Sequence, residues 1–351
     1  MGSVPVDIGI VCPAHDVVSF VEGFFSCLEA QTYQGFRVIV VDDCSSDGSF
    51  EALTKCGAAL GDRFELLRNE RNIGPGPTRN AGLDRLCEEP TEYVTFLDLD
   101  DWFEPTYLQD LHDAAVEFGS DITIAGIVRY EDGTNHVLAT EMVSYADELF
   151  PDSSLVDDFA YINTCLYAKL YRFEEIRGVR FRNMRRSEDT CWLFESLPSL
   201  RSVKFTNNAL YHYRVGAGTL SSALGEDKYE DMHREFARQL RLFDSGPHAP
   251  YREMFECQVY IRSSLGGVTR VAFTDMRRAL SLSLGERRWL DSVMPAWRRN
   301  RYLALGCGHR SRGLKELAMK VTATMYKANV FVLFIFAYYL VSNVLKREVR
   351  A

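Results

Sequence analysis

The sequence predicts an α/β protein with a mainly parallel central sheet, helices on both faces of that sheet, and a helical extension after it. Between residues 8 and 129, short apolar or β-branched runs alternate with segments of helical spacing, a pattern typical of strand–helix–strand units. Residues typical of loops, such as Pro, Asp, Gly and Ser, separate these runs. From residue 226 onward the apolar residues recur at helical spacing instead. At 351 residues, the chain has room for a domain of about 200 residues and an appendage.

Five strands are expected in the first part of the chain. Apolar and β-branched residues dominate each of them, and they cover residues 8–12, 37–41, 64–67, 93–96 and 121–129. Helices are expected over residues 19–31, 50–59 and 106–118, and a further helix opens at Thr78 after the breaker-rich loop 72–77. Ser19 and Glu22 have the spacing of a capping box, which predicts a helix start at this point.

Three carboxylates, those of Asp98, Asp100 and Asp101, follow the strand at residues 93–96. Carboxylates so close together repel one another, and a divalent cation would relieve the repulsion. Ligands that are all oxygen favour Mg²⁺ or Mn²⁺ over zinc. The alternative is a solvated turn of acids that caps the next helix. Because parallel strands end at one edge of a sheet, residues 13–16, 42–43 and 98–101 are expected to lie at the ligand-binding edge.

Charge and cysteine content narrow the class of protein. The net charge is -9, yet residues 296–351 hold about 11 Lys or Arg and about 2 Asp or Glu, so an acidic body carries a basic tail. The acidic body argues against nucleic acid as a partner, whereas the tail suits an anionic membrane surface. The nine cysteines show no Cys-x-x-Cys spacing, and no N-terminal apolar run is long enough for a signal peptide. A reduced, cytosolic setting is expected.

Six ordered motifs in the first 190 or so residues give the chain a resemblance to a known family. They are Pro13-Ala14-His15-Asp16, Gln31-Thr32, Val41-Asp42-Asp43-Cys44-Ser45-Ser46-Asp47-Gly48, Asn72-Ile73-Gly74 with Thr78-Arg79-Asn80-Ala81-Gly82-Leu83, Asp98-Leu99-Asp100-Asp101, and Glu188-Asp189. The set resembles the inverting family 2 glycosyltransferases, which have a GT-A fold and build bacterial polysaccharides. The chain departs from the family pattern with His15 and Asp16 in place of Tyr and Asn, and with Thr78 in place of Ala.

The resemblance implies a site for a nucleotide sugar. It assigns Pro13 and His15 to the pocket around the base, and Asp43 to a hydrogen bond with a base N–H. An uncharged uracil ring offers such a donor, so UDP is the expected nucleotide. Arg79 lies near a helix start beyond a Gly-rich loop, where it could bind phosphate or base; the alternative is a surface arginine on that helix.

The resemblance also assigns the metal and the chemistry. It implies that Asp100 is the direct ligand of Mn²⁺ or Mg²⁺ and that Asp98 faces the ribose and the metal's waters. Asp189 is implied to be the general base and Glu188 its neighbour at the acceptor site. Direct attack assisted by a single base inverts the configuration at C1. Both acids precede an apolar helical run, so the alternative is a pair of acids that only favour a helix N-terminus.

The C-terminal segment is a candidate for membrane attachment. Residues 328–345 carry no charge, and Lys327 and Lys346-Arg347 bracket them. Because this run is slightly shorter than the roughly 20 residues of a typical span, we expect either a single C-terminal span or an in-plane helix; a helix buried in a homodimer is the alternative. The expected domains are residues 1–222 (catalytic, GT-A), 223–327 (helical extension with a basic patch) and 328–351 (membrane-associated or transmembrane helix).

The sequence therefore predicts a metal-dependent inverting glycosyltransferase, a hexosyl- or N-acetylhexosaminyl-transferase at the cytoplasmic face of the cell membrane. It would move a sugar from a UDP-sugar to a hydroxyl of a lipid-linked or polysaccharide acceptor in cell-surface glycan synthesis. A sugar nucleotidyltransferase is one alternative, but it would carry a Gly-rich loop with Lys or Arg where Pro13-Ala14-His15-Asp16 stands. An inactive nucleotide-sugar-binding scaffold is the other, and loss of the acids would indicate it; none is lost.

Overall fold

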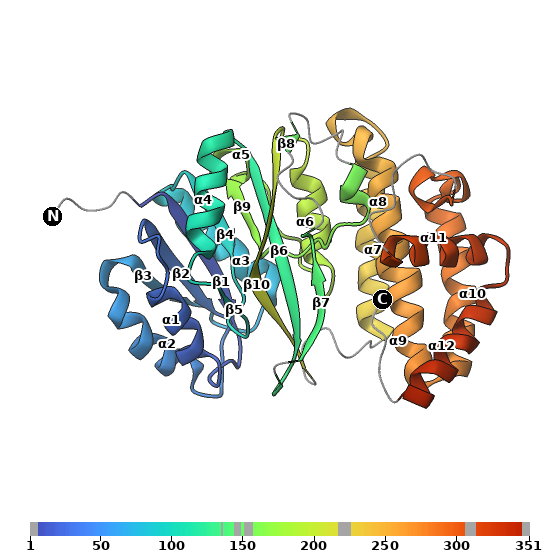
Figure 1. Ribbon diagram of the computed structural model, residues 1–351, viewed down its shortest axis with the longest axis horizontal. Helices are drawn as coiled ribbons and strands as arrows, with labels where there is room; N and C mark the ends of the chain where they lie inside the picture. Colours follow the sequence, from blue (N-terminus) through green and yellow to red (C-terminus); the bar gives the residue numbers. More distant parts are fainter. Residues whose placement is uncertain are drawn as a thin grey trace. The chain divides into compact units, whose positions relative to one another are not determined.

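The computed structural model describes residues 6–134, 136–143, 149–150, 157–216, 226–305 and 314–345. The chain divides into two compact units. The first, Met1–Leu155 with Asn163–Thr219, contains the sheet, and the second, Val156–Ile162 with Leu220–Ala351, is helical (Figure 1). The expected domain boundary between residues 222 and 223 lies outside the described residues.

The first half of the sheet is parallel, and its strands lie in the order β3-β2-β1-β4. These strands are β1 (Ile8–Ala14), β2 (Phe36–Asp42), β3 (Phe64–Arg68) and β4 (Tyr93–Phe96). Ala14 of β1 is opposite Asp42 of β2, and Val11 of β1 is opposite Phe96 of β4. Since all four strands run in the same direction, their carboxyl ends share one edge of the sheet (Figure 1).

The second half of the sheet mixes strand directions. β9 (Lys169–Arg172) is antiparallel to both β4 and β6 (Ile122–Glu131), and β10 (Val203–Val215) is parallel to β6. The short β5 (Trp102–Phe103) pairs with β10, β7 (Val137–Glu141) with β6, and β8 (Leu149–Phe150) with β10. The pairing of β5 holds the segment just after the three acids against β10. The prediction of an α/β fold with a mainly parallel sheet is confirmed.

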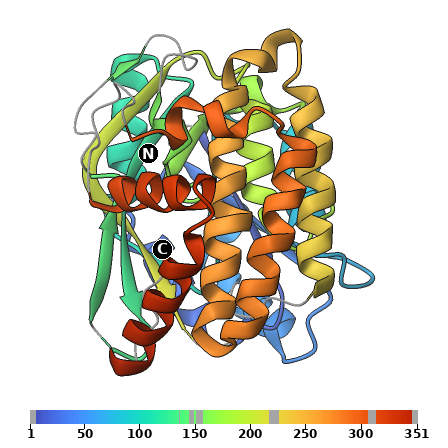
Figure 2. The same cartoon turned by 90° about the vertical axis from the view of Figure 1, so that its right-hand side faces the viewer.

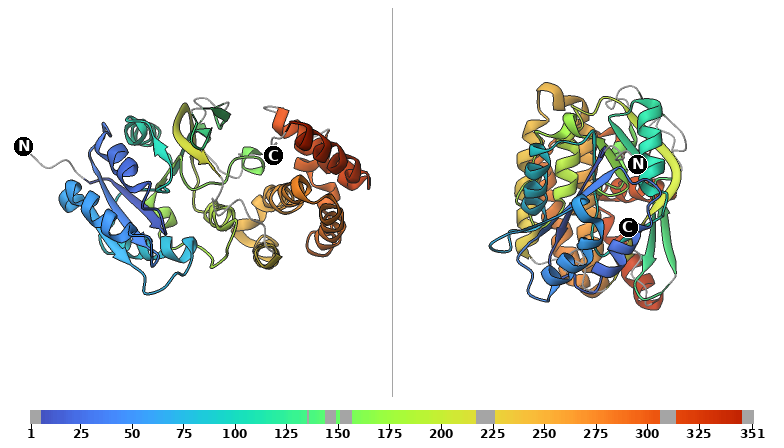
Figure 3. Two further views of the ribbon diagram at one scale, coloured as in Figure 1. Left: turned by 90° about the horizontal axis from the view of Figure 1, so that it is seen from below. Right: turned by 90° about the vertical axis from the view of Figure 1, so that its left-hand side faces the viewer.

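Helices cover both faces of the sheet (Figure 1 and Figure 3). α1 (Val21–Glu29) and α4 (Tyr107–Phe118) lie on one face, and α3 (Pro75–Glu88) and α6 (Glu188–Ser196) lie on the other. α2 (Ser49–Gly57) follows β2. Gly82 allows α3 to approach the sheet closely, because a Cβ atom there would lie 2.5 Å from Cγ1 of Val11.

Two helix starts differ from the prediction. α3 begins at Pro75 and not at Thr78. Pro is compatible with the first helical turn, because the N–H groups there have no acceptor within the helix and the missing N–H of Pro costs no hydrogen bond. α1 begins at Val21 with Phe20 at its N-cap, and no side chain caps it, so the predicted capping box of Ser19 and Glu22 does not form. A turn from Val17 to Phe20 leads into the helix instead.

The second unit is built from helices that pack side by side (Figure 2). They are α7 (Glu226–Leu242), α8 (Arg252–Val259), a π-helical turn (Tyr260–Leu265), α9 (Gly266–Thr274), α10 (Met276–Val293), α11 (Leu314–Lys327) and α12 (Phe331–Leu345). None of the helices in the described part of the chain combines the length and the apolar character needed to cross a membrane.

Candidate active site

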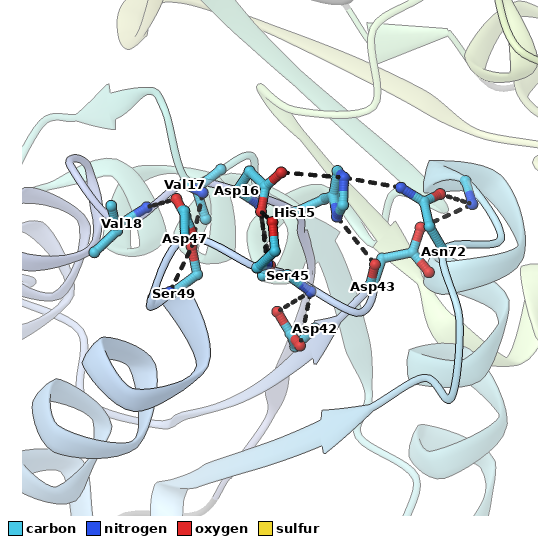
Figure 4. Close-up of polar contacts among 12 residues, drawn as sticks. His15, Asp16, Val17, Val18, Asp42, Asp43, Ser45, Asp47, Ser49 and Asn72 are labelled. Atoms are coloured by element: carbon cyan, nitrogen blue, oxygen red, sulfur yellow. Dashed lines mark hydrogen bonds and ion pairs between the residues drawn. The ribbon is translucent and has the colours of Figure 1, made fainter.

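The loop that follows β2 forms one group of predicted site residues (Figure 4). Asp43 is 3% exposed, and its carboxylate accepts hydrogen bonds from the amides of Ile73 and Gly74 at 2.9 and 2.8 Å and from Nδ2 of Asn69 at 2.7 Å. These bonds fix the loop that precedes α3. Pro13 lies one position before the end of β1. It is opposite Val41 of β2, just before the loop that contains Asp43.

His15 connects the same group to Asn72. Its Nδ1 lies 3.0 Å from the carbonyl oxygen of Asp43, and its Nε2 lies 2.9 Å from Nδ2 of Asn72 (Figure 4). A carbonyl oxygen only accepts, so Nδ1 carries the proton and Nε2 accepts from the Asn72 amide. The imidazole of His15 is therefore held at both nitrogens at the edge of the sheet, and Oδ2 of Asp16 lies 3.5 Å from its Nε2.

The three acids after β4 occupy three different environments. Asp101 is buried; its carboxylate accepts from Oη of Tyr211 and from the amide of Arg214, both at 2.8 Å. Burial and the neighbouring Asp100 raise the pKa of Asp101 well above its usual range. Asp98 pairs with NH2 of Arg79 at 2.8 Å. Asp101 therefore supports the turn, whereas Asp98 and Asp100 remain half-exposed at the site.

Asp100, like Asp101, forms no side-chain ion pair among the described residues, but unlike Asp101 it is partly exposed. Nε of Arg214 donates to its main-chain oxygen at 2.8 Å, which leaves the carboxylate itself without an ion pair. Burial and the charge of Asp98 raise the pKa of Asp100 to about 6. A half-buried carboxylate that is repelled by its neighbour has the character of a metal ligand.

Arg79 joins the acids after β4 to the acids of α6. It is 6% exposed, and its guanidinium contacts Asp98 at 2.8 Å through NH2 and Glu188 at 3.1 Å through NH1. Its Nε has no hydrogen-bond partner in the part of the chain that the structure describes. The alternative of a surface arginine is thus wrong. With two carboxylates already on its guanidinium, Arg79 primarily connects the two acidic segments.

Glu188 and Asp189 are the first two residues of α6, as predicted, and Ser187 before them adopts a left-handed conformation with φ of 60°. Burial and the charge of Asp189 raise the pKa of Glu188. Oδ1 of Asp189 accepts from the amide of Thr190 at 2.6 Å and from its hydroxyl at 3.2 Å. Oδ2 of Asp189 makes no hydrogen bond or ion pair within the described residues, so it can accept one from a substrate.

Several residues that shape the site were not identified from the sequence. The hydroxyl of Thr190 lies 2.7 Å from that of Thr164, and both side chains are fully buried. Tyr167 stacks on Tyr211 with 4.3 Å between ring centroids, and Tyr211 in turn bonds Asp101. No motif marks Thr164 or Tyr167, because their contacts join segments that are distant in sequence.

A divalent cation fits this set of residues in a particular way. No group of three or more His, Cys, Asp or Glu side chains in the described ranges is arranged to hold a metal ion by itself. Mg²⁺ and similar ions at sites of phosphate chemistry are bound by one or two carboxylates together with substrate phosphates and water. The unpaired Asp100, with Asp98 beside it, is compatible with that mode of binding.

Comparisons with known proteins identify the family to which the chain belongs. The model of glycosyl transferase family 2 matches residues 9–186, half of the chain. Glycosyltransferase GlyA of Streptococcus pneumoniae is 26% identical over 269 residues, which cover 71% of this chain and 37% of GlyA. The putative glycosyltransferase EpsH of Bacillus subtilis is 24% identical over 216 residues, which cover 59% and 60% of the two chains. The chain thus spans less than two thirds of the length of these two relatives.

Two further similarities extend over nearly the whole chain. The succinoglycan biosynthesis protein ExoO of Rhizobium meliloti is 26% identical over 333 residues, which cover 90% of this chain and 92% of ExoO. The structure of S. aureus TarS 1–349 in complex with UDP-GlcNAc has a TM-score of 0.68 at 18% identity and covers 92% of each chain. That likeness supports the predicted GT-A fold with its C-terminal helices. The chain belongs to glycosyl transferase family 2.

Proposed function

We propose that this protein is a metal-dependent, inverting glycosyltransferase that moves a sugar from a UDP-sugar to a hydroxyl of a lipid-linked or polysaccharide acceptor. The observation that carries the proposal is the bridge formed by Arg79 between Asp98 and Glu188. It brings the acids suited to a metal and a diphosphate beside the acids suited to an acceptor, so donor and acceptor meet at one edge of the sheet.

The donor nucleotide would bind at the loop after β2. Pro13 and His15 would border the base, and Asp43 would accept its N–H. The position of Asp43 supports this role, because two main-chain amides hold its carboxylate directly after the end of β2. TarS, which has the same fold, was solved with UDP-GlcNAc, and this favours UDP and a hexose or N-acetylhexosamine here.

The metal ion, Mn²⁺ or Mg²⁺, would be held by Asp100 with Asp98 next to it. It would supply Lewis-acid stabilisation of the charge that develops on the diphosphate leaving group. Asp100 is suited to this because its partly exposed carboxylate forms no ion pair among the described residues, whereas Asp98 is already paired with Arg79.

Asp189 would act as the general base. Its Oδ1 is held by Thr190, which leaves Oδ2 to accept the proton of the acceptor hydroxyl. The hydroxyl oxygen attacks C1 as the C1–O bond to the diphosphate breaks, and UDP leaves with the bonding electron pair. A single displacement inverts the configuration at C1, with Glu188 positioned beside the base by Arg79.

Substitution of the base tests the proposal. Asp189→Asn should keep UDP binding, measured as thermal stabilisation by UDP with Mn²⁺, and lose transfer by at least about 100-fold, a typical contribution of a general base. Asp62→Asn, which removes an exposed carboxylate of the same unit, serves as the control. Unchanged transfer in Asp189→Asn would remove Asp189 from the mechanism.

A screen of nucleotide sugars separates the proposal from its two alternatives. Metal-dependent stabilisation followed by transfer or slow hydrolysis with release of UDP would support a glycosyltransferase. Release of pyrophosphate from UTP and a sugar 1-phosphate would indicate a sugar nucleotidyltransferase instead. Stabilisation without turnover for every nucleotide sugar and acceptor would indicate an inactive binding scaffold.

The reaction would take place at the cytoplasmic face of the cell membrane, where a lipid-linked acceptor is available.

A further inference from the structure

The outer face of α12 is apolar along its described length. Val332, Leu333, Phe336, Leu340 and Val341 are each between 45% and 61% exposed. Their spacing places them on one side of the helix, and no charged residue interrupts Phe331–Leu345. A helix on the surface of a soluble protein normally turns polar residues outward, so an apolar outer face of this extent indicates a binding surface.

The opposite face of α12 is attached to the helical unit. Phe331 and Ile335 are buried, and the helix contacts α9, α10 and α11 (Figure 2). Its 15 residues span about 22 Å, less than the ~30 Å of a bilayer core. With one side packed on neighbouring helices and only the other side apolar and open, α12 is suited to lie along a surface.

The charges around α12 favour an anionic surface. Lys327 ends α11 just before the helix, and its Nζ donates to the carbonyl of Leu303 at 2.8 Å. Lys346, Arg347 and Arg350 follow α12 directly in the sequence, with Glu348 among them. Cations at both ends of an apolar helix face are typical of helices that bind negatively charged lipid headgroups.

The same charges disfavour a second copy of the chain as the partner. A two-fold dimer brings the same patch of both copies together. If two α12 helices met, antiparallel packing would place the C-terminal cations of one near Lys327 of the other, and parallel packing would place the two sets of C-terminal cations together. Both arrangements juxtapose like charges, whereas anionic headgroups compensate them.

We propose that α12 is an in-plane membrane helix whose face Val332, Leu333, Phe336, Leu340 and Val341 inserts among the headgroups and upper acyl chains of an anionic lipid surface. The proposal goes beyond the sugar transfer and is independent of it, because vesicle binding is measured without donor or acceptor.

Flotation of the full chain with vesicles tests this directly. Phosphatidylcholine vesicles with and without 30% phosphatidylglycerol, an assay composition of about one anionic lipid in three, would be compared at low and high salt. We expect binding to the anionic vesicles that weakens with salt and at least a tenfold loss in Leu333→Glu. Leu284→Glu is the matched control, because Leu284 of α10 has the same residue type and the same 61% exposure as Leu333; its binding should stay within twofold of the unchanged chain.

A second measurement covers the case in which the glutamate variant fails to fold. Leu333→Trp should be quenched by lipids brominated in the upper acyl chain, whereas Leu284→Trp should not. Failure of the unchanged chain to bind anionic vesicles would overturn the proposal, as would equal binding by the two glutamate variants or equal quenching of the two tryptophans. A dimer in light scattering that Leu333→Glu converts to a monomer, without vesicle binding, would assign the face to a second copy instead.

Discussion

Replacement of Asp100 by asparagine should make the protein more stable and less active. Asp100 is half-buried beside Asp98, and both burial and that charge disfavour its ionised form. Asparagine has nearly the same shape and carries no charge, so it removes the repulsion and keeps the volume. Stored electrostatic strain of this kind is typical of residues that bind a ligand.

The size of the effect follows from the pKa of Asp100. It is about 6 in the folded chain and about 3.9 in an unfolded one, so ionised Asp100 destabilises the fold by up to about 3 kcal/mol. This destabilisation is absent well below pH 4, where both states are protonated, grows as pH rises between the two pKa values, and is complete well above pH 6. The Asp100→Asn variant lacks it at every pH.

Urea unfolding at a series of pH values measures the difference. At pH 7.5 the variant should exceed the unchanged chain by up to about 3 kcal/mol, and the gap should close as pH falls towards 4. Asp62→Asn, an exposed Asp-to-Asn change, should show no such gap. Added Mn²⁺ and UDP should stabilise the unchanged chain more than the variant, by mass action. A variant that is less stable than the unchanged chain at pH 7.5, or a gap that does not depend on pH, would refute this account of Asp100.

Three further predictions concern the same site. Thr190→Val removes the hydroxyl hydrogen bond that helps to orient Asp189 and should lower kcat for transfer by about five- to tenfold, the effect of one hydrogen bond, with UDP binding unchanged; Thr123→Val, which disrupts a similar buried hydroxyl pair with Ser120, should leave kcat unchanged. Arg79→Met leaves two carboxylates without their shared cation and should cost about 3 to 5 kcal/mol in urea unfolding at pH 7.5; a loss below 1 kcal/mol would contradict the bridging role. EDTA should suppress transfer and Mn²⁺ or Mg²⁺ restore it, whereas full activity in chelator would exclude the metal.

The strands and the acids at their ends were predictable because their determinants are local. Each parallel strand is a short apolar run, and the residues after it, such as Asp43 or Asp98, are placed by the strand itself. The N-terminal position of Glu188 and Asp189 in α6 likewise follows from the apolar run behind them. One prediction from a local pattern was wrong. The capping-box spacing at Ser19 is present in the sequence, but the turn from Val17 to Phe20 determines the helix start.

The partners of the site residues could not be predicted in the same way. Glu188 is 109 residues from Arg79 along the chain, and no spacing rule connects them. Asp98, Asp100 and Asp101 look alike in sequence, yet β5 determines their environments by pairing with β10 beside Tyr211. A two-residue strand is too short to be recognised from the periodicity of its side chains.

The contacts around Arg79 connect the residues proposed for the donor with those proposed for the acceptor. Its buried guanidinium pairs with Asp98 on one side and Glu188 on the other, whereas the partly exposed Asp100 carboxylate forms no ion pair among the described residues. On the proposed function, a diphosphate would bring further negative charge to this edge, and a cation bound at Asp100 would offset it. That cation would stabilise the ionised form of Asp100, which burial and the charge of Asp98 disfavour, so the proposal predicts that metal binding and donor binding favour each other.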